Sequence, residues 1–445
     1  MGKNNDLTKG PVVPKLISLT IPMVFGMFSM VAFNIIDTFF ISRLGTKELA
    51  AMGFTFPIIM LVASVALGLG VATASVVSRA IGRGDHHKVQ RFTTDSLMLA
   101  LFLVILFTLA GLFTMDRVFI LMGATADILV FIKQYMKVWY IGVIFVVIPM
   151  VGNNAIRAGG DTLFPSLIMV FSTIINIILD PLLIFGLAGF PRLELAGAAL
   201  ATVIARFFSL IFSLLILHFR EKLIDWSLPK LHEFIDSARR ILYVGFPSAS
   251  SRILLPVAMA VVMRMVAKFG HAAVAAVGVA VRIEMFVFMV IMALATALIP
   301  FIGQNWGAKE FVRVRTACLS ADKFAFWWGL GNFFIFFIFA GFLGELFGKE
   351  AAVSQNIVYY LRIIPFSYAL QGVFILTGSV FNAINKPFLS LGLTLIQMFL
   401  LYIPFAYIGS LWFGLTGLFA GLCLANIIGG FIAISWNKKV VLCTA

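Results

Sequence analysis

Charged residues are scarce in this sequence. Asp, Glu, Lys and Arg make up 12% of its 445 residues, whereas 62% are hydrophobic, and the mean hydropathy is +1.07. A water-soluble globular domain carries roughly twice that share of charge, so this class of protein is excluded. The composition therefore indicates a chain whose main solvent is lipid.

Cysteine and histidine are rare as well. The three cysteines, Cys318, Cys423 and Cys443, lie far apart without a CxxC pair, which excludes a disulfide framework and a zinc site. The five histidines fall in or near expected loops and form no ligand cluster. Because neither a nucleophile motif nor a phosphate-binding loop is present, we expect no enzymatic activity and no cofactor. A membrane-embedded enzyme such as an acyltransferase stays as an alternative from a different class.

Long apolar runs fill the chain instead. Each run is long enough to cross a hydrocarbon core of about 30 Å as a helix, and none shows the alternation of a membrane β-barrel. The runs predict an all-α membrane protein with twelve transmembrane helices. The expected helices are 14–42, 49–79, 94–115, 134–156, 162–188, 195–218, 241–269, 274–304, 317–344, 352–383, 388–410 and 412–436. Segment 118–133 is too short and too charged to span, so we expect an interfacial lead-in there.

Lys and Arg residues gather in alternate loops, which accounts for the formal net charge of +14 without a nucleic-acid partner. By the positive-inside rule both termini are cytoplasmic, which requires an even number of helices. The first apolar segment is too long for a signal peptide and should stay as the first helix. We expect a monomeric, multi-pass protein of the cell (cytoplasmic) membrane that is surrounded by the lipid bilayer.

An internal repeat divides the chain near its middle. At an offset of 225, Pro22 corresponds to Pro247 and Gly45 to Gly270, and after a two-residue slip Gly84 corresponds to Gly307. We expect an N-lobe of six helices (1–218), a cytoplasmic loop (219–240), a C-lobe of six helices (241–437) and a cytoplasmic tail (438–445). Parallel repeats of this kind are typical of carriers that expose a cleft alternately to each side of the membrane.

Two acidic residues break the repeat. Asp37 corresponds to Val262, and Asp180 corresponds to Ile403 or Pro404, so the acids belong to the N-lobe alone. An ionisable residue at membrane depth is costly and usually marks an ion or proton site. Counted from the cytoplasmic end of their helices, the two acids differ in depth by roughly one turn. We therefore interpret them as a pair.

Further polar residues should surround this pair. Ser172, Asn176 and Asp180 follow one helix face at i, i+4 and i+8. Carboxylate, amide and hydroxyl oxygens suit a hard cation, and two carboxylates held close together away from water also retain a proton readily. The predicted polar group includes Asp37, Asn176, Asp180 and Thr202, and its oxygens suit H⁺ or Na⁺. The predicted substrate cavity contains Asn34, Tyr135, Tyr140, Asn153, Asn154 and Ser172.

Structural roles are the alternatives for several of these residues. Asn176 and Thr202 could make only interhelical hydrogen bonds, and Asp37 could be a paired structural acid. Pro22 interrupts the backbone ladder of its helix, so we consider it a hinge candidate. For the other intramembrane charges we expect mutual ion pairs. These charges are Arg252, Arg264, Arg282, Glu284 and Arg362.

The first two helices resemble a known family. The stretch PMVFGMFSMVAFNIIDTFFISRLGTKELAAMGF, with IGQNWGAKE after the eighth helix, resembles the multidrug and toxic compound extrusion (MATE) family, and the likeness covers essentially the whole chain. The resemblance implies two six-helix lobes in a V-shaped arrangement and export of amphipathic, often cationic drugs in exchange for Na⁺ or H⁺.

The resemblance also implies site residues. In the DinF-like branch the coupling site would include Asp37, Asn176, Asp180 and Thr202, near Asn153 and Tyr135, with helix 1 bending at Pro22. The NorM-like branch carries C-lobe acids on helices 7 and 10, which this sequence lacks at convincing positions. A lipid-linked saccharide flippase of the same superfamily is the alternative among carriers, because Arg206, Arg252 and Arg282 could hold a phosphate.

Overall fold

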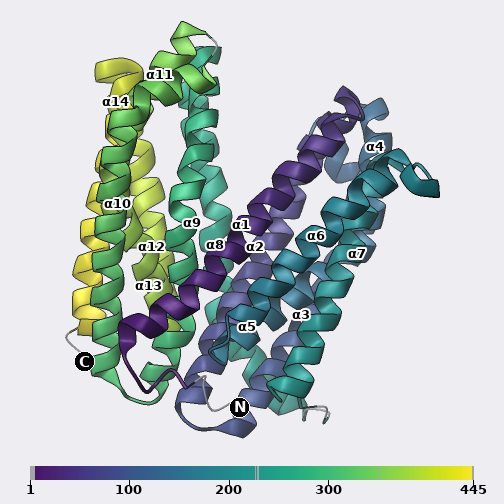
Figure 1. Cartoon of the computed structure of the whole chain (residues 1–445), viewed down its shortest axis with the longest axis vertical. Helices are drawn as coiled ribbons and strands as arrows, with labels where there is room; N and C mark the ends of the chain where they lie inside the picture. The colour runs from purple at the N-terminus through teal and green to yellow at the C-terminus, as the bar shows by residue number, and fades with distance from the viewer. Residues whose placement is uncertain (1–5, 226, 228–229, 349, 443–445) are drawn as a thin grey trace. The chain divides into compact units, whose positions relative to one another are not determined.

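The computed structural model describes residues 6–225, 227, 230–348 and 350–442, and this part of the chain is helical with no strand. The prediction of an all-α protein is confirmed (Figure 1). The α-helices are α1 (Val12–Ser42), α2 (Thr46–Gly82), α3 (His86–Leu121), α4 (Ala126–Gly142), α5 (Ile144–Ala158), α6 (Leu163–Phe185), α7 (Glu194–Leu215), α8 (Leu231–Ala267), α9 (His271–Gly307), α10 (Phe311–Phe347), α11 (Ala351–Ile363), α12 (Tyr368–Ala383), α13 (Pro387–Leu395) and α14 (Ile403–Asn437).

Most of these helices are long and apolar enough to cross a membrane. Within the described residues ten helical segments pass this test, and α4 with α5 passes as an eleventh, bent by 43° at their junction. The tenth segment, Pro387–Val441, has 55 residues and contains a reversal at Phe413 and Gly414, whose dihedral angles are not helical. Dividing it there gives the twelve predicted spans.

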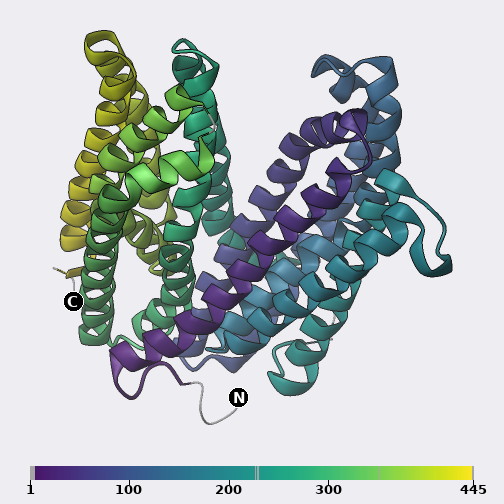
Figure 2. The same ribbon diagram turned by 45° about the horizontal axis from the view of Figure 1, so that its top comes forward.

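The reversal inside α14 depends on glycine. Gly409 and Gly417 face each other so closely that a Cβ on either would collide with the carbonyl oxygen of the other. One helical turn further from the reversal, a Cβ on Gly421 would collide with the carbonyl oxygen of Phe405. Gly414, at the reversal itself, has a φ of +61°. These pairs are symmetric about Phe413, so the two arms form a tight helical hairpin in the yellow C-terminal part of the ribbon (Figure 2).

Two expectations about boundaries were wrong. The fourth predicted span begins at Ala126 and not at residue 134, so the second half of the expected interfacial lead-in 118–133 belongs to α4, while α3 continues to Leu121. Helix α8 begins at Leu231, inside the stretch 219–240 that was expected to be a loop. In both places the helix continues through charged residues such as Asp127. An apolar run ends at such a residue, so the sequence predicts a break there.

The chain packs into two compact units that do not follow the sequence halves strictly. The first contains Ile21–Ala249 with Met1–Asp6, and the second contains Leu7–Thr20 with Ser250–Ala445. Helix α1 therefore changes unit next to Pro22, and α8 changes unit next to Pro247. Each unit thus includes the opening part of the first helix of the other sequence half. The predicted lobe boundaries stay a prediction.

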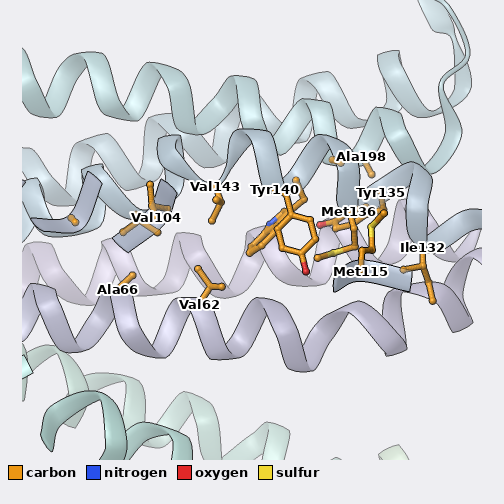
Figure 3. Close-up of a cluster of buried hydrophobic side chains, with 14 of the residues drawn as sticks. Val62, Ala66, Val104, Met115, Ile132, Tyr135, Met136, Tyr140, Val143 and Ala198 are labelled. Atoms are coloured by element: carbon orange, nitrogen blue, oxygen red, sulfur yellow. The ribbon is translucent and has the colours of Figure 1, made fainter. Parts of the chain in front are cut away.

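The first unit has a continuous apolar core. Side chains from α2, α3, α4 and α7 meet in it, including Val62, Met115 and Ala198 (Figure 3). Tyr135 and Tyr140 of α4 are each 5% exposed and belong to this core. The close approach of α3 to α4 requires Gly111, where a Cβ would meet the ring of Tyr140. The core therefore fixes the face of α4 that carries both tyrosines.

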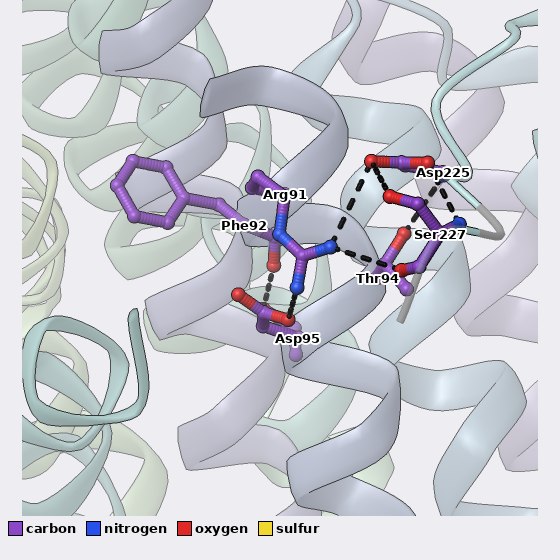
Figure 4. A network of polar contacts seen from close by, with 7 residues as sticks. Arg91, Phe92, Thr94, Asp95, Asp225 and Ser227 are labelled. Atoms are coloured by element: carbon purple, nitrogen blue, oxygen red, sulfur yellow. Dashed lines mark hydrogen bonds and ion pairs between the residues drawn. The ribbon is translucent and has the colours of Figure 1, made fainter. Parts of the chain in front are cut away.

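A polar network holds the segment before α8 in the first unit (Figure 4). Arg91 of α3 pairs with the buried Asp95 at 2.7 Å, donates to the Ser227 carbonyl oxygen at 3.2 Å and lies 3.7 Å from the Asp225 carboxylate. The Asp225 backbone N–H donates to the Thr94 hydroxyl at 3.0 Å. Charge-assisted hydrogen bonds of this kind are about twice as strong as neutral ones, so the connection is firmly held.

The second unit holds the segment before α1 in a comparable way. Arg313 of α10 donates to the carbonyl oxygens of Gly10 at 2.6 Å and Leu7 at 3.0 Å, and its Nε donates to Asn305 Oδ1 at 2.8 Å. The Leu7 N–H donates to Gln304 Oε1 at 3.2 Å. The QN pair in IGQNWGAKE therefore anchors the chain that leads into α1.

Candidate functional site

Asp180 and the polar side chains around it, from α1, α4 and α6, form the polar cluster of the first unit. Asp180 is fully buried on α6, and its Oδ1 accepts a 3.1 Å hydrogen bond from Nδ2 of Asn176, one turn earlier. Asp180 Oδ2 and Asn176 Oδ1 are buried without a hydrogen-bond partner among the described residues. An acceptor left bare in this way is costly, so each is a position where a donor or cation would be stabilised.

Asp37 joins the cluster from α1. Its Oδ1 is buried and, within the described part of the chain, also lacks a hydrogen-bond partner. The carboxylates of Asp37 and Asp180 interact electrostatically with each other and with the hydroxyl of Tyr135 on α4. Three helices therefore bring two carboxylates, one amide oxygen and one phenol together without a cation among the described residues paired to either acid.

Helix packing fixes α6 between α7 and α1. Ser172 on α6 donates to the Ala205 carbonyl oxygen of α7 at 3.1 Å. Gly197 of α7 sits so close to Leu183 that a Cβ would collide with its carbonyl oxygen. On the other side, Thr173 donates to the Ser29 carbonyl oxygen of α1 at 3.3 Å. Sequence reasoning missed Thr173, because nothing in the sequence shows which helix a polar residue will meet.

The remaining predicted site residues have different surroundings. Thr202 is half-buried on α7. Asn34 is exposed and donates to the Met30 carbonyl oxygen of its own helix at 2.8 Å. Tyr140 packs in the apolar core of the first unit. Of the predicted residues, Asn176 is the one that hydrogen-bonds an acid in the described part of the chain, and Tyr135 interacts electrostatically with both acids.

The two asparagines of α5 form a separate polar group. Asn154 donates to the Met150 carbonyl oxygen at 2.7 Å and accepts a 3.4 Å hydrogen bond from the buried Arg157. Asn153 is 6% exposed, and its Oδ1 lacks a hydrogen-bond partner in the part of the chain that the structure describes. Pro22 lies inside α1, which continues without a break from Val12 to Ser42.

The expected ion pairs of the second unit are not found. Within the described residues Arg252, Arg264, Arg282, Glu284 and Arg362 form no ion pair with one another. Arg362 instead lies 5.6 Å from the Phe337 ring centroid, and Glu284 accepts a hydrogen bond from Tyr360. Their helices bring aromatic side chains, and not opposite charges, next to these groups.

The unpartnered oxygen atoms of Asp37, Asn176 and Asp180 in the first unit suit a hard cation or a proton. Alkali cations prefer oxygen ligands, and no cluster of three or more His, Cys, Asp or Glu able to hold a transition metal occurs in the described residues. Twelve apolar spans, together with a buried acid pair within the first unit, are typical of a polytopic membrane transporter.

Comparison with known proteins identifies the family. The sequence pattern of the MatE family matches residues 22–182 and 247–408, so this chain belongs to that family of transporters. The two matches begin at Pro22 and Pro247, the same offset as the predicted repeat. The family assignment makes the chain a multi-pass membrane transporter and not an enzyme.

Individual relatives cover nearly the whole chain. It is 34% identical to a protein of Shewanella oneidensis named "FAD transporter", over 99% of this chain and 97% of that one. It is 27% identical to the Bacillus subtilis "Probable multidrug resistance protein YpnP", over 98% and 97%. The crystal structure of the Vibrio cholerae MATE transporter VcmN in the bent form matches with a TM-score of 0.93 at 30% identity, covering 97% of each chain.

Proposed function

We propose that this transporter is a secondary active multidrug exporter. It moves amphipathic, often cationic compounds out of the cell by antiport with H⁺ or Na⁺ through alternating access. The observation that carries this proposal is the set of buried, unpartnered oxygens on Asp37, Asn176 and Asp180. The relative named as a multidrug resistance protein supports the substrate class.

The coupling ion would act at these oxygens. A proton placed between the Asp37 and Asp180 carboxylates would remove their mutual repulsion, and Na⁺ would be coordinated by the same oxygens, with Thr202 as a further proposed ligand. Either ion relieves the cost of burying bare acceptors. A ligand shifts a two-state carrier only by its differential affinity for the two states, so the ion must bind one cleft orientation better than the other. Pro22 is the proposed bending point of α1.

Substitution of the acids tests the coupling role. We expect Asp37→Asn and Asp180→Asn to lower gradient-driven drug transport in proteoliposomes to near the level of empty liposomes, because an amide cannot exchange a proton or balance Na⁺. Imposing the Na⁺ and pH gradients separately identifies the ion. Asp116→Asn is the matched control, since Asp116 is 53% exposed and pairs with Lys133. Undiminished transport in both acid variants would contradict the proposal.

Export of a flavin dinucleotide is the second candidate. The relative with 34% identity is named for FAD, which carries negative charge at its pyrophosphate. Arg206 of the first unit is half-buried, and its guanidinium carbon lies 5.3 Å from the centroid of the Phe33 ring. Uptake assays in inverted vesicles with FAD and with a cationic dye separate the two candidates. FAD transport that Arg206→Gln abolishes, without dye transport, would favour the flavin.

A further inference from the structure

The second unit carries an open groove whose walls come from α10, α11 and α14. Helix α11 contacts both of the other helices (Figure 1), and the 3₁₀ turn Ile364–Ser367 that follows it completes the groove. The groove has a volume of about 330 Å³, within the range of about 300–1,000 Å³ that is usual for small-ligand sites. All residues that line it belong to the second unit, so it is separate from the acid pair of the first unit.

Apolar side chains form most of the groove. The rings of Phe333 on α10 and Phe366 in the 3₁₀ turn meet edge to face at a centroid distance of 5.5 Å. Phe366 is 60% exposed and Leu424 of α14 is 44% exposed, so both leave apolar surface uncovered. Along α14 the groove extends from Ala420 to Ile427, which is about 10 Å of helix. An uncovered apolar groove of this length suits an acyl chain.

Arg362 is the charged residue that lines the groove, and it is exposed on α11. The middle of the 33-residue span Ala351–Ala383 is Ser367, and Arg362 precedes Ser367 by five residues, so it lies roughly 7–8 Å from the middle of the span along the axis. Among the described residues no Asp or Glu pairs with Arg362. A positive charge at membrane depth without a partner is costly and indicates a functional position.

The guanidinium of Arg362 extends toward one end of the groove. Its central carbon lies 5.6 Å from the centroid of the Phe337 ring. Phe337 is one turn closer than Phe333 to Phe347, where α10 ends and the connection to α11 begins. Long arginine side chains at membrane depth extend in this way toward the level of the lipid head groups. The charge therefore lies at the head-group end of the groove, and the apolar walls continue from it toward the middle of the membrane.

A phospholipid with a net negative charge matches this arrangement. The planar guanidinium presents N–H donors that fit two oxygens of one phosphate. Basic pockets between transmembrane helices bind anionic lipid head groups. A soluble anion would leave the apolar walls uncovered, and a hydrocarbon chain alone would leave the charge unpaired. We propose that the groove binds an anionic phospholipid of the bilayer, with its phosphate on Arg362 and one acyl chain along Phe333, Phe366 and Leu424.

Lipid-dependent stability of the purified protein tests the site. A ligand that binds only the folded state stabilises it, so phosphatidylglycerol should raise the melting temperature of the wild type in detergent more than phosphatidylcholine does. Arg362→Gln should remove this difference, and Arg362→Lys should keep part of it, because lysine retains the charge but not the planar set of donors. Native mass spectrometry should show about fivefold less bound phosphatidylglycerol for Arg362→Gln than for the wild type.

A second variant tests the apolar part of the groove. Ala420→Phe adds a ring to the groove and leaves Arg362 in place, so it should lower the amount of bound phosphatidylglycerol by excluding the acyl chain. As matched controls, Arg264→Gln removes another exposed arginine of the second unit, and Ala275→Phe adds a ring to an exposed alanine of α9. Neither control residue lines the groove, so both variants should respond to phosphatidylglycerol like the wild type.

Equal amounts of bound phosphatidylglycerol in the wild type and in Arg362→Gln would overturn the inference, as would an equal loss in the two controls. Soluble glycerol 1-phosphate that raises the melting temperature as much as the lipid does would show a site for free phosphate, and would also overturn it. Asp180→Asn, which tests ion coupling, should keep the full response to phosphatidylglycerol. The lipid site and the coupling site can therefore fail independently of each other.

Discussion

Single aspartates in this protein differ in what surrounds their oxygens. Asp225 accepts hydrogen bonds from the Ser227 backbone N–H at 2.9 Å and hydroxyl at 2.7 Å, and Arg91 lies nearby. These contacts, first the backbone hydrogen bond, lower the pKa of Asp225 below its usual value. Asp180 receives one hydrogen bond and keeps its second oxygen bare. The first environment holds a carboxylate in place, whereas the second leaves it able to bind.

A pH effect on stability follows from Asp225. Because its folded-state pKa is lowered, its contribution to stability is present above its unfolded pKa, about 4, and is lost as the pH falls through the folded value. We expect Asp225→Asn to lower the melting temperature in detergent at pH 7, with the difference from wild type shrinking below about pH 4. A constant difference across this range would contradict the assignment. Asp236→Asn, at an exposed helix pair, is the control.

At the scale of elements, close helix contacts position the acids. α7 approaches α6 through Gly197, near the turn that carries Asp180, and Ser172 ties the same two helices further along. Small residues allow such close approach in membrane bundles, where apolar burial gives little drive to associate. The position of Asp180 therefore depends on a glycine of the neighbouring helix that carries no polar side chain.

Enlarging this glycine tests the dependence. Gly197→Val should separate α6 from α7, destabilise the protein by about 1–3 kcal/mol and lower gradient-driven transport, because overpacking shifts the backbone. Gly53→Val is the matched control, since a Cβ at Gly53 meets nothing within 4 Å. Thermal unfolding and proteoliposome transport measure both effects. Equal behaviour of the two variants would show that the α6–α7 contact does not matter.

At the scale of the whole molecule, both units anchor a leading segment with an arginine from the third helix of a repeat. Arg91 holds residues 225 and 227, and Arg313 holds Leu7 and Gly10. We expect Arg313→Ala to raise amide hydrogen exchange in residues 7–10 and Arg91→Ala to raise it at Asp225 and Ser227, because exposed backbone opens more often once its hydrogen bonds are lost. Increases that spread through both units would contradict this local role.

Much of the fold could be predicted because the length of an apolar run shows that it can cross a membrane as a helix. Twelve runs, the repeat and the stripe of Ser172, Asn176 and Asp180 follow from the order of residues alone. Contacts between distant helices could not be predicted. Tyr360 and Glu284 lie 76 residues apart, and Thr173 and Ser29 lie 144 apart, so only the packed structure shows that they meet. The boundary that the sequence predicts between the spans 388–410 and 412–436 lies within a few residues of the observed reversal at Phe413 and Gly414.

The exchange of opening segments between the two units has a consequence for biosynthesis. The segment Leu7–Thr20 is made first, yet it belongs with residues made after Ser250. The first unit likewise is complete only when the chain has been made as far as Ala249. A chain that ends after the sixth apolar span would therefore have an unfinished first unit and an N-terminal segment without the residues that it packs against.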